Sequence, residues 1–488
     1  MSLFPDTMLL IDGELRIAEG GATYPDISPW DGTEIGRAAD ASAADLDKAI
    51  AAARKAFDDT DWSRDHAGRL TVLRRYANII KANRDRFAEL ARHEQGAAGG
   101  AVYGPACDAP LGMLDFTLEL ADSYEWEEDL GVGEMFGFKS RRKVWKEAAG
   151  VVAAITPWNM PTQINLAKMF PALAAGCTVI LKAAPDTPML AALLGELAVE
   201  AGLPAGVLNV ITSSSNAEIG EALVKDPRVD IISFTGSTGV GKRIMANASD
   251  RVAKVFLELG GKSASIILDD VDVAAAAARG AGSLYHAGQG CAAITRILVP
   301  KSRYEEAVAG LKAAFESVQY GDLDSPMQVM GPLISEKQRE RVLGYIEIGK
   351  AEGARLVTGG GVPAHTDKGG FFVEPTVFAD VTNDMRIARE EIFGPVLVLI
   401  PYEDDEDAIR IANDSPYGLS GAVNSASPER ALKVARRIRS GTFSINGGLY
   451  YGGDAPFGGY KQSGIGREMG VAGFEEYLET KTVAMPEV

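Results

Sequence analysis

The sequence predicts an α/β protein with two halves built on doubly wound parallel sheets, and a separate stretch of exposed strands. Short apolar runs at 150–155, 178–182, 207–211 and 230–234 alternate with helical segments. This alternation is typical of parallel strands that are buried on both faces. The same pattern resumes after residue 290, so a second sheet is expected. Within residues 130–149 apolar and charged residues alternate instead, which indicates exposed strands.

The composition is that of an ordinary globular protein, with 488 residues, 46% hydrophobic and 24% charged. The formal net charge of -18 argues against binding to nucleic acid or to an anionic membrane. Three cysteines do not make a disulfide framework, so a reducing cytoplasm is the simplest location. We see no signal peptide, and no apolar run reaches the roughly 18 residues that span a bilayer.

The N-terminal part is predicted to contain short strands and then three long helices. Residues 1–40 alternate apolar runs with turn formers. Ser42 can cap a helix over 41–58. Two more helices are predicted over 65–93 and 106–127, from their apolar faces.

The later elements continue the alternation. Before the cysteine loop we expect helices at 162–175, 187–200, 217–224 and 239–248, and further strands at 254–259 and 263–268. After it we expect strands at 296–299, 354–358, 396–402 and 480–485, and helices at 304–318, 336–352, 406–413 and 428–438. Two α/β halves with a ligand site at their junction are the economical model.

The stretch from Gly288 to Cys291 places a thiol beside two glycines. Glycines let a substrate or cofactor approach the sulfur closely, so Cys291 is a candidate nucleophile. Most free cysteines are inert packing, and that alternative stays open on this stretch alone. Cys107 and Cys177 are interpreted as packing cysteines.

A glycine-rich turn from Phe234 to Gly241 follows a strand and opens a helix. Helix N-termini favour anions, and Ser237 could donate to a phosphate, although the spacing differs from the usual dinucleotide fingerprint. A simple strand-to-helix turn is the alternative.

Two polar residues end apolar strands. Asn159, between two prolines, could donate to an oxyanion, or could only form a turn. Glu258 precedes a Gly-Gly break, and a carboxylate in an apolar strand is a candidate general base. A capping or ion-pair role would also explain Glu258. The turns at 391–396 and 456–461 each carry an aromatic that could line a pocket.

Taken together, these motifs resemble the aldehyde dehydrogenase superfamily over nearly the full chain. The matching stretches follow the family's order, at 157–161, 234–237, 258–262, 288–291, 391–396 and 456–461. The resemblance implies NAD(P)-dependent oxidation of an aldehyde to a carboxylic acid, with no metal required. It also implies a homodimer or homotetramer.

The resemblance further implies a division of the chain into three parts. A Rossmann-like cofactor-binding domain would comprise 1–123 and 147–259, and a catalytic domain 260–462. An oligomerisation element would comprise 124–146 and 475–488, with its β-arm pairing across subunits.

The family mechanism carries over residue by residue. Cys291 would attack the aldehyde, Asn159 and the Cys291 N–H would hold the oxyanion, and Glu258 would activate water to hydrolyse the thioester. The resemblance also places two further residues at the catalytic site, Lys168 near the nicotinamide ribose and Glu468 in a proton relay. Cofactor-binding positions implied in the same way are Thr156, Trp158, Lys182, Ser213, Gly236, Ser237, Leu259, Glu391 and Phe393.

The sequence departs from the family pattern near the adenine ribose. Pro185 occupies the place of a glutamate that binds the ribose hydroxyls, and Ser213 lies in a run of hydroxyl residues that could bind phosphate. We therefore predict that NADP is tolerated and competes with NAD. Asp186 is the counter-argument, since its carboxylate could restore a preference for NAD.

His286 stands where the family often has asparagine. A Cys–His pair with Cys291 is one interpretation, but an imidazole that faces a helix or a subunit contact is favoured.

The substrate tunnel implied by the family is mostly apolar and aromatic. Its expected lining is Met160, Gln163, Leu449, Tyr450 and Tyr451, with Ala167, Gly290, Met113 and Phe116 nearby. A medium-sized hydrophobic aldehyde, aliphatic or aromatic, fits this set best. The alternatives are a CoA-acylating relative, which the Glu258 base argues against, a non-catalytic structural relative and a cofactor-free cysteine hydrolase.

Overall fold

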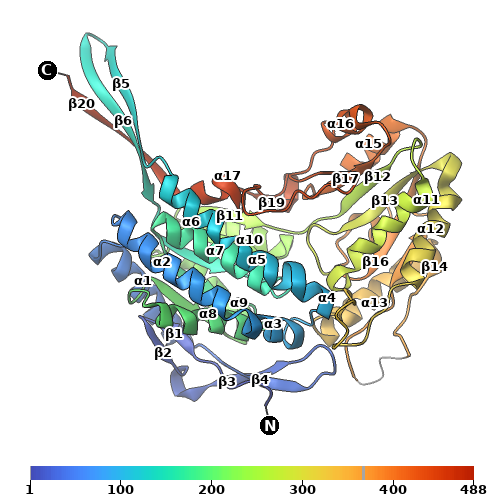
Figure 1. The fold of residues 1–488 in the computed structure, drawn as a ribbon, viewed down its shortest axis with the longest axis horizontal. Coiled ribbons are helices and arrows are strands. Elements are labelled where there is room, and N and C mark those ends of the chain that lie inside the picture. The colour runs from blue at the N-terminus through green and yellow to red at the C-terminus, as the bar shows by residue number, and fades with distance from the viewer. Residues whose placement is uncertain (1, 365–368, 488) are drawn as a thin grey trace.

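The computed structural model describes residues 2–364 and 369–487, so the outermost residues of the predicted domain ranges lie outside it. Figure 1 shows two α/β bodies side by side and a β-arm that rises from the first of them. Each body contains a mainly parallel sheet with helices packed against it. The predicted fold class is therefore confirmed, whereas the predicted domain boundaries stay a prediction.

The first body is built on an eight-stranded sheet. Its parallel centre runs in the order β11 (Lys254–Glu258), β10 (Ile231–Thr235), β7 (Val151–Ile155), β8 (Thr178–Lys182) and β9 (Leu208–Ile211). The antiparallel strands β1 (Leu9–Ile11), β2 (Glu14–Arg16) and β19 (Gly464–Ile465) complete its edges. All residues of β7, β8, β9 and β10 are buried, as the apolar runs predict.

Helices cover both faces of this sheet. Alternate strand residues contribute to two separate cores, because successive side chains point to opposite faces. One face packs against α2 (His66–Ala82), α3 (Arg84–His93), α5 (Asp108–Gly112), α6 (Leu114–Ser123), α7 (Pro161–Ala175) and α8 (Pro188–Ala201). The other face packs against α1 (Ala43–Asp59), α9 (Asn216–Lys225) and α10 (Thr238–Ser249).

Two of the predicted long helices are wrong in extent. The helix over 65–93 breaks at Asn83, whose side-chain amide donates to the carbonyl of Ile79 at 2.9 Å and caps α2. The helix over 106–127 divides into α5 and α6 around Met113 and ends at Ser123. Its last predicted turn is extended because the backbone from Glu127 onward pairs with a neighbouring strand.

The second body is built on a seven-stranded sheet. Its order is β14 (Arg355–Thr358), β15 (Thr376–Ala379), β16 (Val396–Tyr402), β13 (Ile294–Pro300), β12 (Ser263–Ile267), β17 (Gly421–Asn424) and β18 (Ser444–Ile445). The chain therefore changes sheets between β11 and β12. Its core includes α11 (Val273–Ala278), α12 (Tyr304–Glu316), α13 (Glu336–Ala351), α14 (Arg386–Arg389), α15 (Asp405–Asn413) and α16 (Pro428–Ala435).

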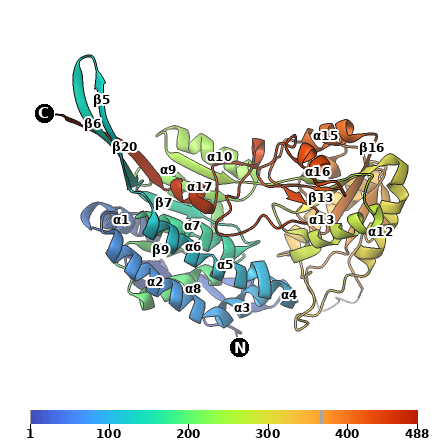
Figure 2. The same ribbon diagram turned by 45° about the horizontal axis from the view of Figure 1, so that its top comes forward.

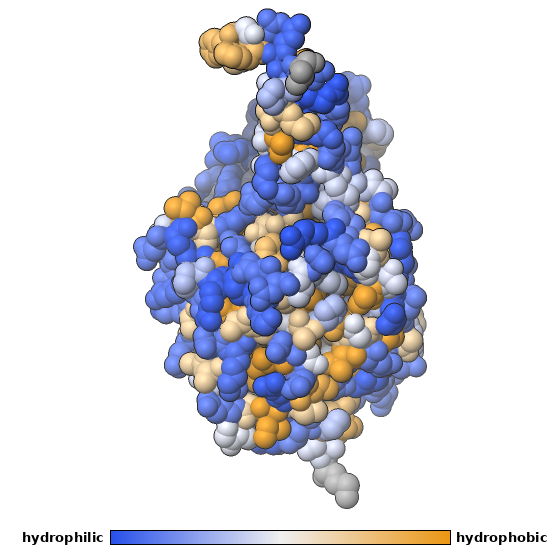
Figure 3. Space-filling model, turned by 90° about the vertical axis from the view of Figure 1, so that its left-hand side faces the viewer, coloured by the Kyte–Doolittle hydropathy of each residue, from blue (hydrophilic) through white to orange (hydrophobic). Residues whose placement is uncertain are grey.

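The arm is a three-stranded antiparallel sheet of β5 (Glu127–Met135), β6 (Phe138–Ala148) and β20 (Leu478–Pro486). The tail strand predicted at 480–485 is confirmed within β20. The C-terminal segment links all parts, since it leaves the second sheet at β18, joins the first at β19, and enters the arm after α17 (Gly470–Glu475) (Figure 2). Figure 3 shows orange side chains at the end of the arm, where Met135, Phe136 and Phe138 are 68%, 91% and 76% exposed.

The remaining short elements lie near the N-terminus and beside α5. A hairpin is formed by β3 (Thr23–Ile27) and β4 (Glu34–Ala39), and the short helix α4 (Gly99–Ala101) leads into a single wide turn, η2 (Val102–Ala106).

A buried arginine ties α2 to the end of α7. Arg69 is 2% exposed, and it donates to the carbonyls of Ala174 at 3.1 Å and Trp62 at 2.7 Å. Burial lowers the pKa of Arg69 to about 10, which is still high enough to keep the guanidinium charged near neutral pH. This side chain satisfies two carbonyls that would otherwise lose a partner away from water.

We predict that Arg69→Met lowers stability markedly. Methionine fills similar space but cannot donate, so the loss should be about 3 kcal/mol, or roughly 3–6 °C in the apparent melting midpoint measured by differential scanning fluorimetry. Arg64→Met is the matched control, because the Arg64 side chain is 70% exposed and has only solvent-exposed contacts, at 3.4 Å with Thr60 O and 3.7 Å with Asp61. Equal midpoints for the two variants would contradict this role.

Candidate active site

The polar residues singled out from the sequence meet where the two bodies face each other. Glu258 is the last residue of β11, and Asn159 lies in the loop between β7 and α7. Cys291 follows η3 (Arg279–Gly288) and precedes β13 of the second sheet. Carboxyl ends of parallel strands are where α/β proteins usually place their ligands.

The loop before Cys291 is held in an unusual backbone conformation. His286, Ala287 and Gly288 have φ values of 48°, 52° and 73° in succession. A Cβ on Gly288 would lie 2.2 Å from the carbonyl oxygen of Gly394, so glycine is required there. The side chain of Gln289 locks the loop by donating to Pro332 O at 3.2 Å and accepting from Ile334 N at 3.0 Å.

Asn159 is joined directly to this loop. Its side-chain Nδ2 donates to the carbonyl oxygen of Gln289 at 2.9 Å, and its own carbonyl accepts from Gln95 at 2.8 Å. Asn159 is 4% exposed, so its position is well defined. An amide nitrogen carries two N–H groups, and the second remains available to a substrate oxyanion.

Glu258 is a buried carboxyl group without a hydrogen-bond partner among the described residues. It is 2% exposed, and neither oxygen has a partner there. Burial, followed by the nearby Glu468 carboxylate, raises the pKa of Glu258 well above its usual range. A carboxylate with a raised pKa binds a proton more strongly than an ordinary one, which suits a general base.

Lys168 is the positive charge beside this carboxyl group. Its Nζ lies 3.1 Å from Oε1 of Glu468 and donates to the Ser233 hydroxyl at 3.2 Å. The ammonium also lies 4.5 Å from the centre of the Phe256 ring. The Ser233 hydroxyl is in turn 3.2 Å from the hydroxyl of Tyr477, just before the first residue of the arm strand β20.

The Cys291 thiol lies among acidic groups. Burial raises the pKa of Cys291 to about 12, and the Glu258, Glu391 and Glu468 carboxylates add to the increase. The thiol is therefore protonated near neutral pH in this state of the protein. Attack on a substrate requires the thiolate, so a proton must leave the sulfur first.

Glu391 contacts the Gly-Gly break after β11. Its Oε1 accepts from Gly261 N at 2.8 Å, and a Cβ on Gly260 would lie 2.4 Å from its other oxygen. Burial raises the pKa of Glu391 to about 7. Nearby, Trp158 and Phe393 pack edge to face with ring centroids 5.4 Å apart.

The adjoining strand ends have the chemistry that a dinucleotide needs. The hydroxyls of Thr156 and Thr235 are buried and have no partner within the described chain, although β7 and β10 are adjacent. Ser237 caps α10, whose N-terminus would attract a pyrophosphate. Gly236 N donates to Glu258 O at 3.0 Å, and Leu259 N donates to Ser463 O at 2.9 Å, so both hold the backbone beside β11.

The residues predicted for the adenine end are engaged within the protein. Lys182 is fully buried, with its ammonium bonded to Ala183 O and to the side chain of Asn216. The hydroxyls of Ser213 and Ser214 donate to the Asp40 carboxylate at 2.9 and 2.6 Å. Sequence analysis treated these hydroxyls as possible phosphate donors, but a carboxylate already accepts from them.

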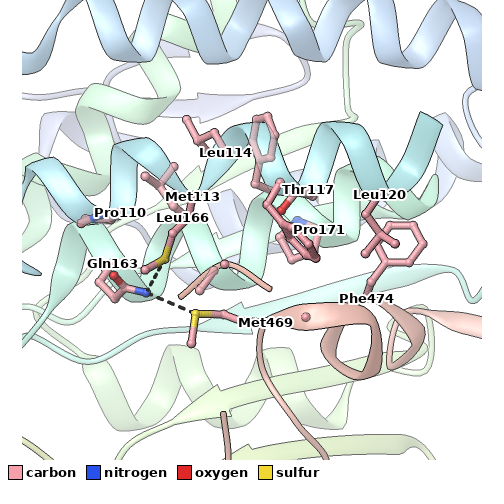
Figure 4. A pocket seen from close by; sticks show the side chains of 15 residues that line it. Pro110, Met113, Leu114, Thr117, Leu120, Gln163, Leu166, Pro171, Met469 and Phe474 are labelled. Carbon is pink, nitrogen blue, oxygen red and sulfur yellow. Dashed lines mark hydrogen bonds between the residues drawn. The ribbon is translucent and has the colours of Figure 1, made fainter. Parts of the chain in front are cut away.

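An apolar pocket runs along α7 (Figure 4). The space between protein atoms along it amounts to about 470 Å³ when open solvent is counted, and about 30 Å³ of it has room for the centre of a water-sized molecule. None of the described residues lining it is charged. The lining includes Met113, Phe116 and Leu120 from α5–α6, Gln163, Ala167 and Phe170 from α7, and Met469 and Phe474 near α17.

The predicted tunnel residues fall in different places. Gln163 lines this pocket, as do Met113, Phe116 and Ala167. Tyr451 lies near the sulfur, since the Cys291 and Glu468 charges raise its pKa after burial does. Met160 contacts Gln95, Tyr450 bonds to Ser420 at 3.2 Å, and Leu449 is 88% exposed at the surface.

The remaining histidine and cysteine candidates do not join the group of residues around Cys291. His286 is buried, its Nε2 lies 3.5 Å from the side-chain nitrogen of Gln289, and burial lowers its pKa to about 4. Cys107 and Cys177 are fully buried, which agrees with their interpretation as packing residues.

Comparison with known proteins identifies the chain. Residues 17–483 match the model of the aldehyde dehydrogenase family. This chain belongs to the aldehyde dehydrogenase family. It is 42% identical over 444 residues to the geranial dehydrogenase of Castellaniella defragrans, covering 90% of each protein.

Solved structures of other aldehyde dehydrogenases have the same fold. The enzyme of Mycobacterium tuberculosis, solved with NAD+, superposes with a TM-score of 0.94 at 42% identity and 99% coverage of both chains. An aldehyde dehydrogenase of Pseudomonas syringae, solved with NAD+ and octanal, gives 0.90 at 38% identity, covering 98% of this chain and 96% of that one.

Several neighbours of the site in this aldehyde dehydrogenase were not predicted. No local motif indicates Ser233, Tyr477 or Asp40, because only the folding of the chain brings them close to the predicted residues. Four further residues line the pocket along α7, namely Leu114, Leu120, Phe170 and Phe474. Apolar helix faces in the sequence could have indicated that they are buried, but not that they line a pocket. Among the described residues, no group of three or more His, Cys, Asp or Glu side chains could hold a metal ion, and no helix is long and apolar enough to cross a membrane.

We predict that the thiol of the ligand-free enzyme reacts slowly with iodoacetamide at neutral pH. Because the pKa of Cys291 is raised to about 12, the alkylation rate should increase about tenfold per pH unit through pH 10 without a plateau. Mass spectrometry of the labelled peptide would follow Cys291, with Cys291→Ala as the control for labelling elsewhere. A plateau near pH 8.5 would contradict the raised pKa.

Proposed function

We propose that this aldehyde dehydrogenase oxidises a medium-sized hydrophobic or aromatic aldehyde to a carboxylic acid. The observation that carries the proposal is the junction of Cys291, the Asn159 amide and the partnerless Glu258 carboxyl at one site. These groups match the needs of an acyl transfer to sulfur followed by hydrolysis.

In the first half-reaction, the Cys291 sulfur adds to the aldehyde carbon as thiolate. The carbonyl oxygen becomes an oxyanion, which the free N–H of Asn159 and the Cys291 backbone N–H stabilise. Because the Asn159 side chain is bonded to Gln289 O at 2.9 Å, the donor is oriented before the substrate arrives. Bound NAD supplies the acceptor for the hydride that leaves the adduct, so that a thioester remains on Cys291.

In the second half-reaction, Glu258 takes a proton from water. The hydroxide equivalent adds to the thioester carbon, the carbon–sulfur bond breaks, and the acid and the Cys291 thiolate are released. Lys168 and Glu468 adjust the proton affinity of Glu258 in opposite directions, since the ammonium lowers its pKa and the carboxylate raises it.

Cofactor binding is assigned to the carboxyl ends of β7, β10 and β11. The partnerless hydroxyls of Thr156 and Thr235 and the N-terminus of α10 fit a dinucleotide, and Glu391 fits ribose hydroxyls. Trp158 and Phe393 would form aromatic walls beside it.

The substrate class rests on the uncharged pocket along α7. One relative is named for geranial, and one similar structure was solved with octanal. Both compounds are apolar aldehydes, which supports the same substrate class here. The exposed apolar end of the arm supports a homodimer or homotetramer, because such side chains are usually covered by a partner.

We predict that acylation and hydrolysis can be separated by substitution. Cys291→Ala should lose about 10⁴-fold in aldehyde oxidation, because no nucleophile remains. Glu258→Gln should give a burst of about one NADH per active site followed by a turnover rate roughly 10²–10⁴-fold below wild type. Stopped-flow absorbance at 340 nm would measure both phases.

Two controls accompany this test. Glu479→Gln alters an exposed carboxylate of the arm and should leave both phases unchanged. Product analysis with and without CoA should give free acid in either case. Release of acyl-CoA alone, or full turnover by Cys291→Ala, would exclude the proposed reaction.

We predict that NADP is tolerated, but less well than NAD. Pro185 removes one carboxylate from the expected ribose position, whereas the Asp40 carboxylate beside Ser213 and Ser214 adds a negative charge nearby. Asp40→Asn should shift the NADP/NAD ratio of kcat/KM toward NADP about fivefold, the effect of roughly 1 kcal/mol of repulsion.

Asp58→Asn, on the exposed surface of α1, is the control for general charge effects. A wild-type preference for NAD of a hundredfold or more would rule out NADP tolerance. An unchanged ratio in Asp40→Asn would remove Asp40 from the explanation.

A further inference from the structure

One polar side chain stands apart in the apolar pocket along α7. Gln163 lies in the first turn of α7, is 6% exposed, and its amide points toward the pocket (Figure 4). The other lining residues are apolar except for the hydroxyl of Thr117. A buried amide in such surroundings requires an explanation, since burying a polar group without partners is unfavourable.

The contacts of the Gln163 amide are weak. Its Nε2 lies 3.8 Å from the sulfur of Met113 and 3.8 Å from the sulfur of Met469, and thioethers are poor acceptors. Its Oε1 has no hydrogen-bond partner among the described residues. An unpaired buried carbonyl of this kind is unfavourable, and a ligand with a matching donor would offset that cost.

Contacts with the two methionines determine the position of the Gln163 amide in the pocket. Met113 comes from the α5–α6 junction and Met469 precedes α17, so the amide lies between two walls of the pocket. Glu468, next to Met469, lies near the Cys291 sulfur and contributes to the increase in its pKa. Gln163 therefore lies at the end of the pocket that is lined by Met469, the residue next to Glu468 in the chain.

We propose that Gln163 binds a hydroxyl group on the substrate, so that the preferred aldehydes are apolar molecules with an uncharged hydroxyl. This inference rests on the proposed function. A hydroxyl can donate to Oε1 and accept from Nε2, and thus matches both halves of the amide. A charged group is disfavoured, because none of the described lining residues offers an opposite charge.

The position of Gln163 guides the choice of test substrate. Gln163 comes four residues after Asn159, the oxyanion donor, which lies in the loop before α7. Because Asn159 holds the aldehyde oxygen, the group that Gln163 binds must lie away from the carbonyl, and a substituent at the para position of an aromatic ring meets this condition. Ala167, one further turn along α7, leaves room for the ring or for a chain beyond it.

The test compares two aldehydes of equal size. 4-(Hydroxymethyl)benzaldehyde carries the hydroxyl, and 4-ethylbenzaldehyde replaces it with a methyl group. The readout is the ratio of their kcat/KM values, measured with NAD in the wild type and in Gln163→Leu, which retains the side chain's volume but neither hydrogen-bonding group. Intrinsic differences in aldehyde reactivity cancel when the two ratios are compared.

We expect the wild type to have a higher kcat/KM for the hydroxyl substrate than for 4-ethylbenzaldehyde. In Gln163→Leu this ratio should fall at least tenfold, chiefly because KM for the hydroxyl substrate rises. Thr117→Val removes the other polar group of the pocket and is the matched control, with the wild-type ratio expected to persist. An unchanged ratio in Gln163→Leu, or an equal loss of preference in Thr117→Val, would overturn the assignment to Gln163.

The failure of this inference is distinguishable from failure of the proposed function. If the wild type reduces neither NAD nor NADP with either aldehyde or with hexanal, the proposed function fails. If both aldehydes are oxidised and their ratio is insensitive to Gln163→Leu, the function stands and the hydroxyl site is excluded. 4-Methoxybenzaldehyde, which can accept but not donate, adds a check: a kcat/KM near that of the hydroxyl substrate would contradict donation to Oε1.

Discussion

The burial of Glu258 is the constraint on which the rest of the site depends. A carboxyl group at the end of β11, with no hydrogen-bond partner among the described residues, is tolerated only because its surroundings allow it to hold a proton. The nearby positive charges of Lys168 and Arg467 moderate this effect, and Lys168 is itself held by Glu468 and Ser233. The same low-polarity environment raises the pKa of Cys291. Burial therefore raises the proton affinity of the carboxyl group and leaves the thiol protonated near neutral pH in the ligand-free protein.

The Cys291 loop shows how two sheets make one site. The first sheet supplies Asn159 and Glu258, and the second supplies the loop, which is joined to the first by the bond from Asn159 to Gln289. The Gly-Gly break after β11 allows the closest approach, because a Cβ on Gly261 would lie 2.5 Å from the carbonyl oxygen of Cys291. Neither body alone contains the complete set of groups, so the geometry of the junction is as important as the residues themselves.

Much of this arrangement could be predicted from sequence, for identifiable reasons. Continuous apolar runs such as Val151–Ile155 have few alternatives to a buried parallel strand, and the alternating pattern before them indicated exposed strands, which the family resemblance assigned to an arm. Helix interruptions were missed because a single side-chain bond, such as that of Asn83, decides them.

Within the site, the motifs indicated Cys291, Glu258 and Asn159, but their partners depend on long-range contacts. The hydroxyl residues near Ser213 were read as anion donors because nothing local shows that Asp40, far away in the chain, accepts from them. Gln163 was predicted to line the substrate tunnel and does line an apolar pocket, whereas its lack of a polar partner is visible only in three dimensions.

The hydroxyl of Tyr477 gives the C-terminal arm strand a physical connection to the catalytic centre. β20 starts at the next residue, and the chain of contacts runs from Tyr477 to Ser233 to Lys168. The Lys168 ammonium in turn lowers the pKa of Glu258, so the contacts lead from the base of the arm to a carboxyl group between the two bodies. The position of the tail and the proton affinity of that carboxyl group are therefore physically linked.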